Sequence, residues 1–293
     1  MKFAGGVNLF ANTSKKLLKT KGATMSYIIN KQKLNKLKNL NNYFVITDFD
    51  RTLTTAESEP TMGVIPQYLG GECLEKRTKI YEHYRPLELD YTIEASKKQE
   101  IMKEWAKESF TLLTQYITKE GIENALINAD LYLRSGAKEF LQEMNDNNIP
   151  VIIMSSGIGN IVKAFLEKEN CLFNNIKIVS NFFEFNNGIT TINMNNIMAT
   201  SNKEYGRIPE NIRSQIEERE KALVFGDLIE DIKMIDKEKL SKTLTFGFLD
   251  ENVKQNLERY KENFDIVLTE NDNFNTVRNI LKNKEENNGN KLV

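Results

Sequence analysis

Short, continuously apolar segments rich in β-branched and aromatic residues alternate with amphipathic helical patterns, and this alternation limits the possible folds of the chain most strongly. Segments that are apolar at successive positions fit strands buried on both faces, as in a parallel sheet covered by helices on both sides. The sequence therefore predicts an α/β fold with a Rossmann-like parallel sheet core. The segments expected to form strands are 43–47, 150–154, 176–179, 222–225, 243–248 and 264–268.

The stretch from residue 60 to residue 128 interrupts this alternation. Its pattern is helical over 70–81 and 92–116, and it contains no convincing strand. We interpret it as a helical insertion after the first strand. The predicted domains are a core formed by residues 26–58 and 130–282 and a helical cap formed by residues 59–129.

The two ends of the chain differ from the rest in composition. Residues 1–25 carry five lysines and no acid, but they lack the long apolar stretch of a secretory signal and the arginines of an organellar transit peptide. An added leader, an alternative start ahead of Met25 and a basic arm all remain open, and we expect this segment to be disordered. The polar residues 283–293 are expected to form a flexible tail.

Composition excludes several classes of protein. The formal net charge is −1 with 28% charged residues, so no large basic field is available for a nucleic-acid polymer. No apolar run approaches the roughly 20 residues that span a bilayer, so we expect no membrane association. The two cysteines, Cys73 and Cys171, form no CxxC pair, which fits a reducing, cytoplasmic location and excludes a disulfide framework. We expect a monomer.

The chain has a single histidine, His83, whose sequence neighbours Tyr81, Glu82 and Tyr84 offer no second metal ligand at a suitable spacing. A structural or surface role is favoured for it over a catalytic one. Any catalysis should therefore depend on carboxylates, a lysine and a metal ion.

The pentapeptide Asp48-Phe49-Asp50-Arg51-Thr52 directly follows the first predicted strand. Two carboxylates so close together at a strand end are costly unless a cation accompanies them. Magnesium is the natural candidate, because it binds through one or two carboxylates, water and substrate phosphate. A strand that ends in a solvated acidic turn is an equally good interpretation of this pentapeptide alone.

Three further polar motifs follow later strands or lie between them. Ser155-Ser156-Gly157 could hold phosphate oxygens through hydroxyls and backbone amides, although such turns are common in loops. Lys203 alone would be interpreted as a solvated loop lysine. In Gly226-Asp227-Leu228-Ile229-Glu230-Asp231, carboxylates again emerge where an apolar strand ends, although Asp231 could merely cap the following helix.

Together and in this order, the motifs resemble those of the haloacid dehalogenase-like superfamily over residues 43–281. A closer resemblance, to the cytosolic type III pyrimidine 5′-nucleotidase family, is carried by Leu87-Glu88-Leu89-Asp90, by Glu104-Trp105 with Ser109, and by the segment 153–159. In that family the insertion after the first motif is a helical cap. The resemblance implies a magnesium-dependent 5′-nucleotidase that hydrolyses pyrimidine nucleoside 5′-monophosphates.

The resemblance also implies a role for each matched residue. Asp48 is the nucleophile, Asp50 the general acid and base, and Lys203 a catalytic cation that also contacts the phosphate. The metal set is Asp48, Asp50 through its backbone carbonyl, Asp227 and, from a second layer, Asp231. The substrate-binding residues are Thr52, Glu88, Ser109, Ser155, Ser156, Gly157 and Lys203, and Trp105 belongs to the core with a possible edge on the site.

Two departures affect the expected substrate and leave the phosphate chemistry unchanged. Arg51 stands where the animal enzymes carry an apolar residue, and the segment between Thr52 and Glu88 is shorter and differently composed. Another phosphatase of the superfamily, acting on phosphoserine or 7-methylguanosine monophosphate, is therefore an alternative. A non-catalytic protein that binds a phosphorylated ligand is a further alternative, and a phosphotransferase side activity is compatible with the same residues.

Overall fold

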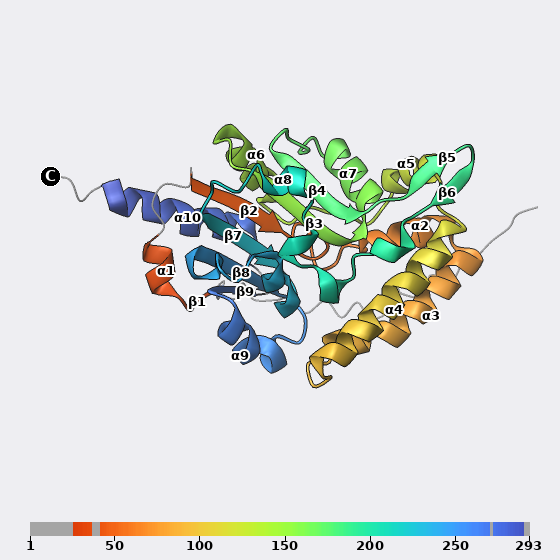
Figure 1. Cartoon of the computed structure of the whole chain (residues 1–293), viewed down its shortest axis with the longest axis horizontal. Helices are drawn as coiled ribbons and strands as arrows, with labels where there is room; N and C mark the ends of the chain where they lie inside the picture. The colour runs from red at the N-terminus through yellow and green to blue at the C-terminus, as the bar shows by residue number, and fades with distance from the viewer. Residues whose placement is uncertain (1–25, 37–41, 270–271, 290–293) are drawn as a thin grey trace, which may run out of the picture.

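A seven-stranded sheet with the order β1-β9-β8-β7-β2-β3-β4 forms the centre of the computed structural model, which describes residues 26–36, 42–269 and 272–289 (Figure 1). All neighbouring strands from β9 to β4 are parallel, and only β1 joins antiparallel, beside β9. The predicted α/β fold with a parallel sheet is therefore confirmed. The strands are β1 (Tyr27–Ile28), β2 (Tyr43–Thr47), β3 (Val151–Ile158), β4 (Ile176–Asn181), β7 (Lys221–Gly226), β8 (Thr243–Leu249) and β9 (Ile266–Thr269).

Strand β2 shows why the apolar segments lack alternation. It lies between β3 and β7, with Val45 opposite both Val151 and Leu223. Val45 packs in the cluster on one face of the sheet, whereas Phe44 and Ile46 pack in the cluster on the other face. Every position of this strand is consequently buried, and every position is apolar except the terminal Thr47.

The two faces of the sheet are covered differently. Phe140 of α6 (Ala137–Asp146), Phe165 of α7 (Gly159–Lys168) and Phe274 of α10 (Phe274–Gly289) pack in the cluster that contains Val45. The other face is covered mainly by short turns, which contribute Ile208 and Met234. The remaining helical elements outside residues 60–128 are α1 (Lys31–Asn35), α8 (Glu210–Arg213), α9 (Val253–Asn263), η2 (Met194–Asn196), η3 (Thr200–Asn202), η4 (Tyr205–Arg207), η5 (Ile229–Met234) and η6 (Leu240–Lys242).

The stretch from residue 60 to residue 128 is helical, as predicted. It contains α2 (Thr61–Leu69), α3 (Gly71–Leu89), α4 (Ala95–Thr114) and α5 (Lys119–Ile127). Helices α3 and α4 pack side by side and extend away from the sheet, whereas α5 packs against α7 (Figure 1). Helix α3 continues past the predicted end at residue 81, through Pro86, to Leu89. The division of the chain into a core and a cap at residues 59–129 stays a prediction.

Short elements were missed by the sequence interpretation. Strands β5 (Glu184–Asn186) and β6 (Ile189–Thr191) form a hairpin around Asn187-Gly188, whose φ angles of 50° and 78° fit the mirror-image turn that Asn-Gly favours.

Helix α10 continues to Gly289, past the predicted start of the tail at residue 283. The predicted basic arm, residues 1–25, and residues 290–293 lie outside the described residues. In the described part of the chain, no helix has both the length and the apolar character needed to cross a membrane.

Candidate active site

Three neighbouring strands deliver polar side chains to one edge of the sheet. Asp48 follows β2, the Ser156–Gly157 turn lies near the end of β3, and Asp227 follows β7. Because β2 lies between β7 and β3, their carboxyl ends meet, as expected for ligand sites of parallel sheets. A single cavity at this edge is lined by eight of the predicted site residues, which are Asp48, Asp50, Glu88, Ser109, Ser156, Gly157, Lys203 and Asp227.

Lys203 connects two buried carboxylates. Its Nζ atom lies 2.5 Å from Asp48 Oδ1 and 2.6 Å from Asp231 Oδ1, and the residue is only 2% exposed. Asp231 is fully buried and its Oδ2 accepts a hydrogen bond from the backbone N–H of Leu228 at 3.0 Å. Burial opposes the charged form of Lys203, but the carboxylates of Asp231 and Asp48 outweigh it and raise the lysine pKa. Lys203 is therefore a fixed ammonium beside Asp48.

The carboxylates around Lys203 exceed its charge. Oxygen atoms of Asp48, Asp227 and Asp231 all lie within 4.8 Å of one another. Burial raises the pKa of Asp48 to about 7, against the opposing effect of Lys203, and burial followed by the Asp48 charge raises the pKa of Asp227 well above its usual value. Three carboxylates and one ammonium would carry a net charge of −2 when ionised, so the site is suited to a divalent cation with hard oxygen ligands.

The donor set fits a magnesium ion through Asp48 and Asp227. Asp231 is engaged on both oxygens, by Lys203 and by the Leu228 N–H, so it supports the site rather than offering a free ligand atom. The Asp50 side chain does not belong to the carboxylate group of three, and the predicted role of its backbone carbonyl in metal binding stays a prediction.

The Asp50 side chain is held by Thr61, the first residue of α2. The Thr61 backbone N–H donates to Asp50 Oδ1 at 2.9 Å, and the Thr61 hydroxyl donates to Oδ2 at 2.8 Å. The same hydroxyl accepts from the Ile158 N–H at 3.2 Å, so it connects Asp50 to the end of β3. Burial raises the pKa of Asp50, although the bonds from Thr61 oppose the shift. Asp50 is thus aimed into the cavity in a fixed position.

The irregular last part of β3, where the register shifts between Met154 and Ile158, leaves no room for a side chain at Gly157. A Cβ atom at this position would lie 1.9 Å from Thr61 Oγ1 and 2.9 Å from Asp50 Oδ2. The Gly157 N–H donates to Ser155 Oγ at 3.0 Å. Ser155 is 1% exposed and lies outside the cavity lining, so in this structure its hydroxyl shapes the turn.

Thr52 also lies outside the cavity lining, unlike the other predicted phosphate-site residues of the first motif. It is fully buried, and its hydroxyl has no hydrogen-bond partner among the described residues. Arg134 stabilises the loop that contains Thr52. It donates to the Thr52 carbonyl at 3.1 Å and pairs with Asp250 at 2.7 Å. The Thr52 hydroxyl thus lies outside the cavity lining in this structure, and its predicted contact with the substrate stays a prediction.

Comparison with known proteins agrees with this geometry. Residues 61–284 match the model of the family described as pyrimidine 5′-nucleotidase (UMPH-1). The human 7-methylguanosine phosphate-specific 5′-nucleotidase is 30% identical over 249 residues, covering 81% of this chain and 83% of the human protein. The chain belongs to the pyrimidine 5′-nucleotidase family. The equivalent protein of Drosophila melanogaster is 29% identical over 257 residues, covering 81% of this chain and 78% of its own length.

Solved structures give the same result for the fold. The crystal structure of cytosolic 5′-nucleotidase IIIB bound to cytidine has a TM-score of 0.74 and 27% identity, covering 89% of this chain and 91% of that chain. A substrate-bound phosphoserine phosphatase has a TM-score of 0.52 at 22% identity, covering 82% of this chain and 97% of that chain, and it shares the fold. The resemblance to the haloacid dehalogenase-like superfamily is confirmed, and this member of the nucleotidase family is a phosphoric monoester hydrolase.

The wall of the nucleotidase cavity opposite the sheet comes from α3 and α4. Tyr81 and Trp105 line it together with Ser109. The Trp105 ring stacks on Tyr84 with 5.8 Å between ring centroids and an interplanar angle of 9°. The cavity therefore joins an acidic, lysine-containing floor to an aromatic wall, and Trp105 contributes both to the packing of α4 against α3 and to the cavity surface.

Several residues that shape the nucleotidase site were missed in the sequence. Asn181, the last residue of β4, donates to the Ser156 and Met198 carbonyls, each at 2.8 Å, and accepts from the Met198 N–H at 2.7 Å. It thereby connects the last part of β3 to the segment leading to Lys203. A polar residue at the end of a predicted strand was the available signal. Thr61 offered a weaker signal, a threonine directly after proline at a helix start.

Proposed function

We propose that this protein is a magnesium-dependent 5′-nucleotidase that hydrolyses pyrimidine nucleoside 5′-monophosphates through an aspartyl-phosphate on Asp48. The observation that carries the proposal is the position of Asp48. It pairs with Lys203, lies close to the carboxylates of Asp227 and Asp231, and lines a cavity that also has an aromatic wall. This arrangement suits a phosphate at one end of the cavity and a planar base at the other.

In the first half-reaction, an Asp48 carboxylate oxygen forms a bond to phosphorus while the bond between phosphorus and the 5′-oxygen breaks. Asp50 gives its proton to that oxygen, which leaves as the nucleoside hydroxyl. The raised pKa of Asp50 favours the protonated form that this step needs. Thr61 keeps the carboxyl group in position for the transfer.

In the second half-reaction, Asp50 takes a proton from a water molecule whose oxygen bonds to phosphorus, and the bond to Asp48 breaks. Free phosphate leaves and the Asp48 carboxylate is restored. In both half-reactions, Lys203 offers a positive charge to the phosphoryl oxygens. Ser156 and Gly157, in the last part of β3, offer polar groups to the same oxygens. A magnesium ion held by Asp48, the Asp50 carbonyl and Asp227 would supply the remaining neutralisation of charge on the transferred group.

The preference for pyrimidines is supported by the family match and by the cytidine in the similar crystal structure. Glu88 and Ser109 lie in the cavity wall, where they would meet the nucleoside. A second candidate substrate is 7-methylguanosine monophosphate, because the curated relatives of about 30% identity act on it. A phosphotransferase side activity would use the same residues. We also propose a cytoplasmic monomer whose cap is formed within residues 59–129.

The test is phosphate release from UMP, CMP, 7-methyl-GMP, AMP, GMP and phosphoserine, each with magnesium and with EDTA. We expect magnesium-dependent release that is fastest with UMP and CMP. Asp48→Asn should lower the rate by several orders of magnitude, because an amide is a poor nucleophile. The matched control is Asp146→Asn, an exposed aspartate on α6.

The alternatives predict different outcomes. Fast turnover of phosphoserine or 7-methyl-GMP alone would keep the reaction and replace the substrate. An Asp48→Asn enzyme with near-normal turnover at saturating magnesium would refute the covalent mechanism. Absence of turnover on every compound would favour the non-catalytic protein that binds a phosphorylated ligand.

A further inference from the structure

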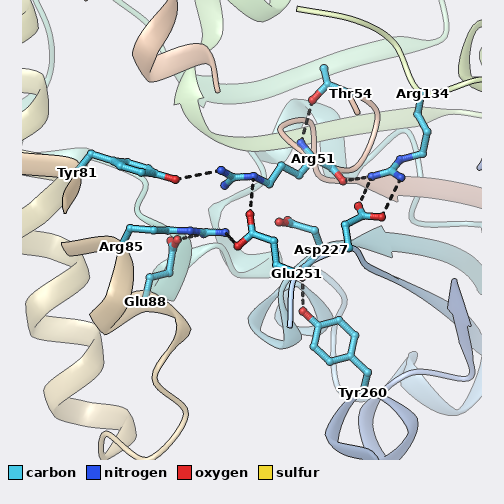
Figure 2. Close-up of polar contacts among 10 residues, drawn as sticks. Arg51, Thr54, Tyr81, Arg85, Glu88, Arg134, Asp227, Glu251 and Tyr260 are labelled. Atoms are coloured by element: carbon cyan, nitrogen blue, oxygen red, sulfur yellow. Dashed lines mark hydrogen bonds and ion pairs between the residues drawn. The ribbon is translucent and has the colours of Figure 1, made fainter. Parts of the chain in front are cut away.

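Four charged side chains form a chain of ion pairs between the cap helix α3 and two loops of the core (Figure 2). Arg85 Nη1 donates to Glu88, and Arg85 Nη2 donates to Glu251 Oε2 at 3.0 Å. The other oxygen of Glu251 lies 3.5 Å from Arg51 Nε, and Arg51 Nη2 donates to the Tyr81 hydroxyl at 3.1 Å. Two guanidinium groups and two carboxylates thus alternate, and their charges cancel.

The Arg85–Glu88 pair is the buried part of this chain. The exposed fractions of the two side chains are 11% and 6%, whereas Glu251 is 41% exposed. Arg85 and Glu88 both line the cavity, and Glu251 lines only the smaller neighbouring pocket. Charges of opposite sign attract strongly in such a poorly solvated place, and Glu251 holds Arg85 from the other side. Glu88 therefore meets a ligand as half of a neutral pair rather than as a free carboxylate.

The charge of the base decides what this neutral pair does. The 7-methylguanine ring carries a delocalised positive charge, whereas cytosine and uracil are neutral. A buried carboxylate without a partner would bind the cationic ring more tightly than a neutral ring. A guanidinium beside that carboxylate repels the cationic ring and so cancels this difference in affinity. We infer that Arg85 is a specificity-determining residue that turns the nucleoside site toward neutral bases and away from 7-methylguanine. This inference rests on the proposed 5′-nucleotidase function.

Binding of the free nucleosides tests the inference without depending on turnover. The titrations use cytidine and 7-methylguanosine, followed by calorimetry and by the fluorescence of Trp105, which is the only tryptophan in the chain and lines the cavity. In Arg85→Met we expect the ratio of the two affinities to shift toward 7-methylguanosine by about tenfold or more, as expected for one unscreened charge. The ratio of kcat/KM for 7-methyl-GMP and CMP should shift in the same direction, mainly through KM.

Further variants separate charge from packing. In the Glu88→Gln background, Arg85→Met should still shift the affinity ratio toward 7-methylguanosine, because the guanidinium repels the cationic ring whether or not Glu88 is charged. Arg85→Lys should keep the wild-type preference. Glu251→Gln loosens the contact of α3 with the core but leaves the Arg85–Glu88 pair, so it should not move the ratio. Arg259→Met removes an exposed arginine of α9 near the same border and serves as the charge control.

An unchanged ratio in folded Arg85→Met would overturn the inference, and so would a Glu251→Gln variant that reproduces the shift. Failure of both nucleosides to bind wild type and Arg85→Met would overturn it too, even if phosphate release stood. The opposite result, the expected shift in binding without phosphate release from any monophosphate, would support the role of Arg85 and reject the proposed reaction.

Discussion

Replacing Lys203 by methionine removes the only ammonium among the carboxylates of the cavity floor while it keeps most of the side-chain volume. Lys203 is 2% exposed and pairs with Asp48 and Asp231 at 2.5 and 2.6 Å. Loss of one partner from a buried ion pair costs about 3 to 5 kcal/mol, because the remaining charge is left without compensation. With EDTA present, we therefore expect the free energy of unfolding of Lys203→Met to fall by about this amount.

Magnesium should restore part of the lost stability. With the aspartates ionised, the charge of the floor changes from −2 to −3 when Lys203 is removed, so a divalent cation should stabilise the variant more than it stabilises wild type. A ligand at 100 times its dissociation constant adds about 2.7 kcal/mol to stability, which sets the scale of the wild-type gain. Phosphate release should still fall by about 100- to 1,000-fold, because the lysine contact with the phosphoryl oxygens is lost.

The assay is urea unfolding, followed by circular dichroism, of wild type and Lys203→Met in EDTA and in magnesium. The control is Lys163→Met, an exposed lysine of α7 whose pair with Glu167 spans 3.8 Å and should contribute less than about 1 kcal/mol. A loss below about 1 kcal/mol in EDTA, together with equal magnesium gains in both proteins, would refute the view that Lys203 balances the charge of a metal site.

Two further substitutions and one labelling experiment have defined outcomes. Gly157→Ala should displace Asp50 and Thr61 and reduce kcat, whereas Gly206→Ala, whose added Cβ meets no atom within 4 Å, should leave kcat near the wild-type value. Asn181→Ala leaves the buried Met198 N–H without its acceptor and should lower the urea unfolding free energy by about 1 to 3 kcal/mol. Burial raises the pKa of the Cys73 thiol and raises that of Cys171 to about 11. A disulfide reagent at pH 8 should therefore label neither cysteine in the native protein and both after unfolding. Rapid labelling of the native protein would contradict their burial.

The sequence predicted where the acidic residues of the cavity floor lie, because the order of the parallel strands determines their position. A buried strand is recognisable from its apolar run, and in a parallel sheet the residue that follows it lies at the ligand edge. The positions of Asp48 and Asp227 could be predicted in this way, whereas their roles came from the resemblance. Lys203 could be placed only by the resemblance, since a lysine in a loop carries no local signal that it will pair with Asp48, 155 positions away.

The cap side of the site was less predictable for the same reason. Glu251 and Arg85 are 166 positions apart, and each belongs to a sequence that fits an ordinary surface helix or loop. Arg51 was recognised as a departure, but its partner could not be named. Its φ of 60°, uncommon for a residue other than glycine, places its side chain toward α3 and Glu251, and no sequence pattern specifies that turn. Thr52 matches the motif, yet its buried hydroxyl lies outside the cavity lining, so the substrate contact suggested by the motif stays a prediction.

The packing of α2 connects the rest of the insertion to the residue that positions Asp50. Helix α2 packs against α3, α5 and β3, and its first residue, Thr61, holds Asp50. Gly70 and Gly71 follow, both with positive φ of 64° and 51°, before α3 begins. A displacement of α3 and α4 about these glycines would carry Glu88, Arg85 and the aromatic wall with it. It would also act on the residues around Asp50, because α3 packs on α2 and its Tyr81 hydroxyl accepts a hydrogen bond from Arg51. The proposed contacts with the base and the proposed proton-transfer group are therefore mechanically coupled.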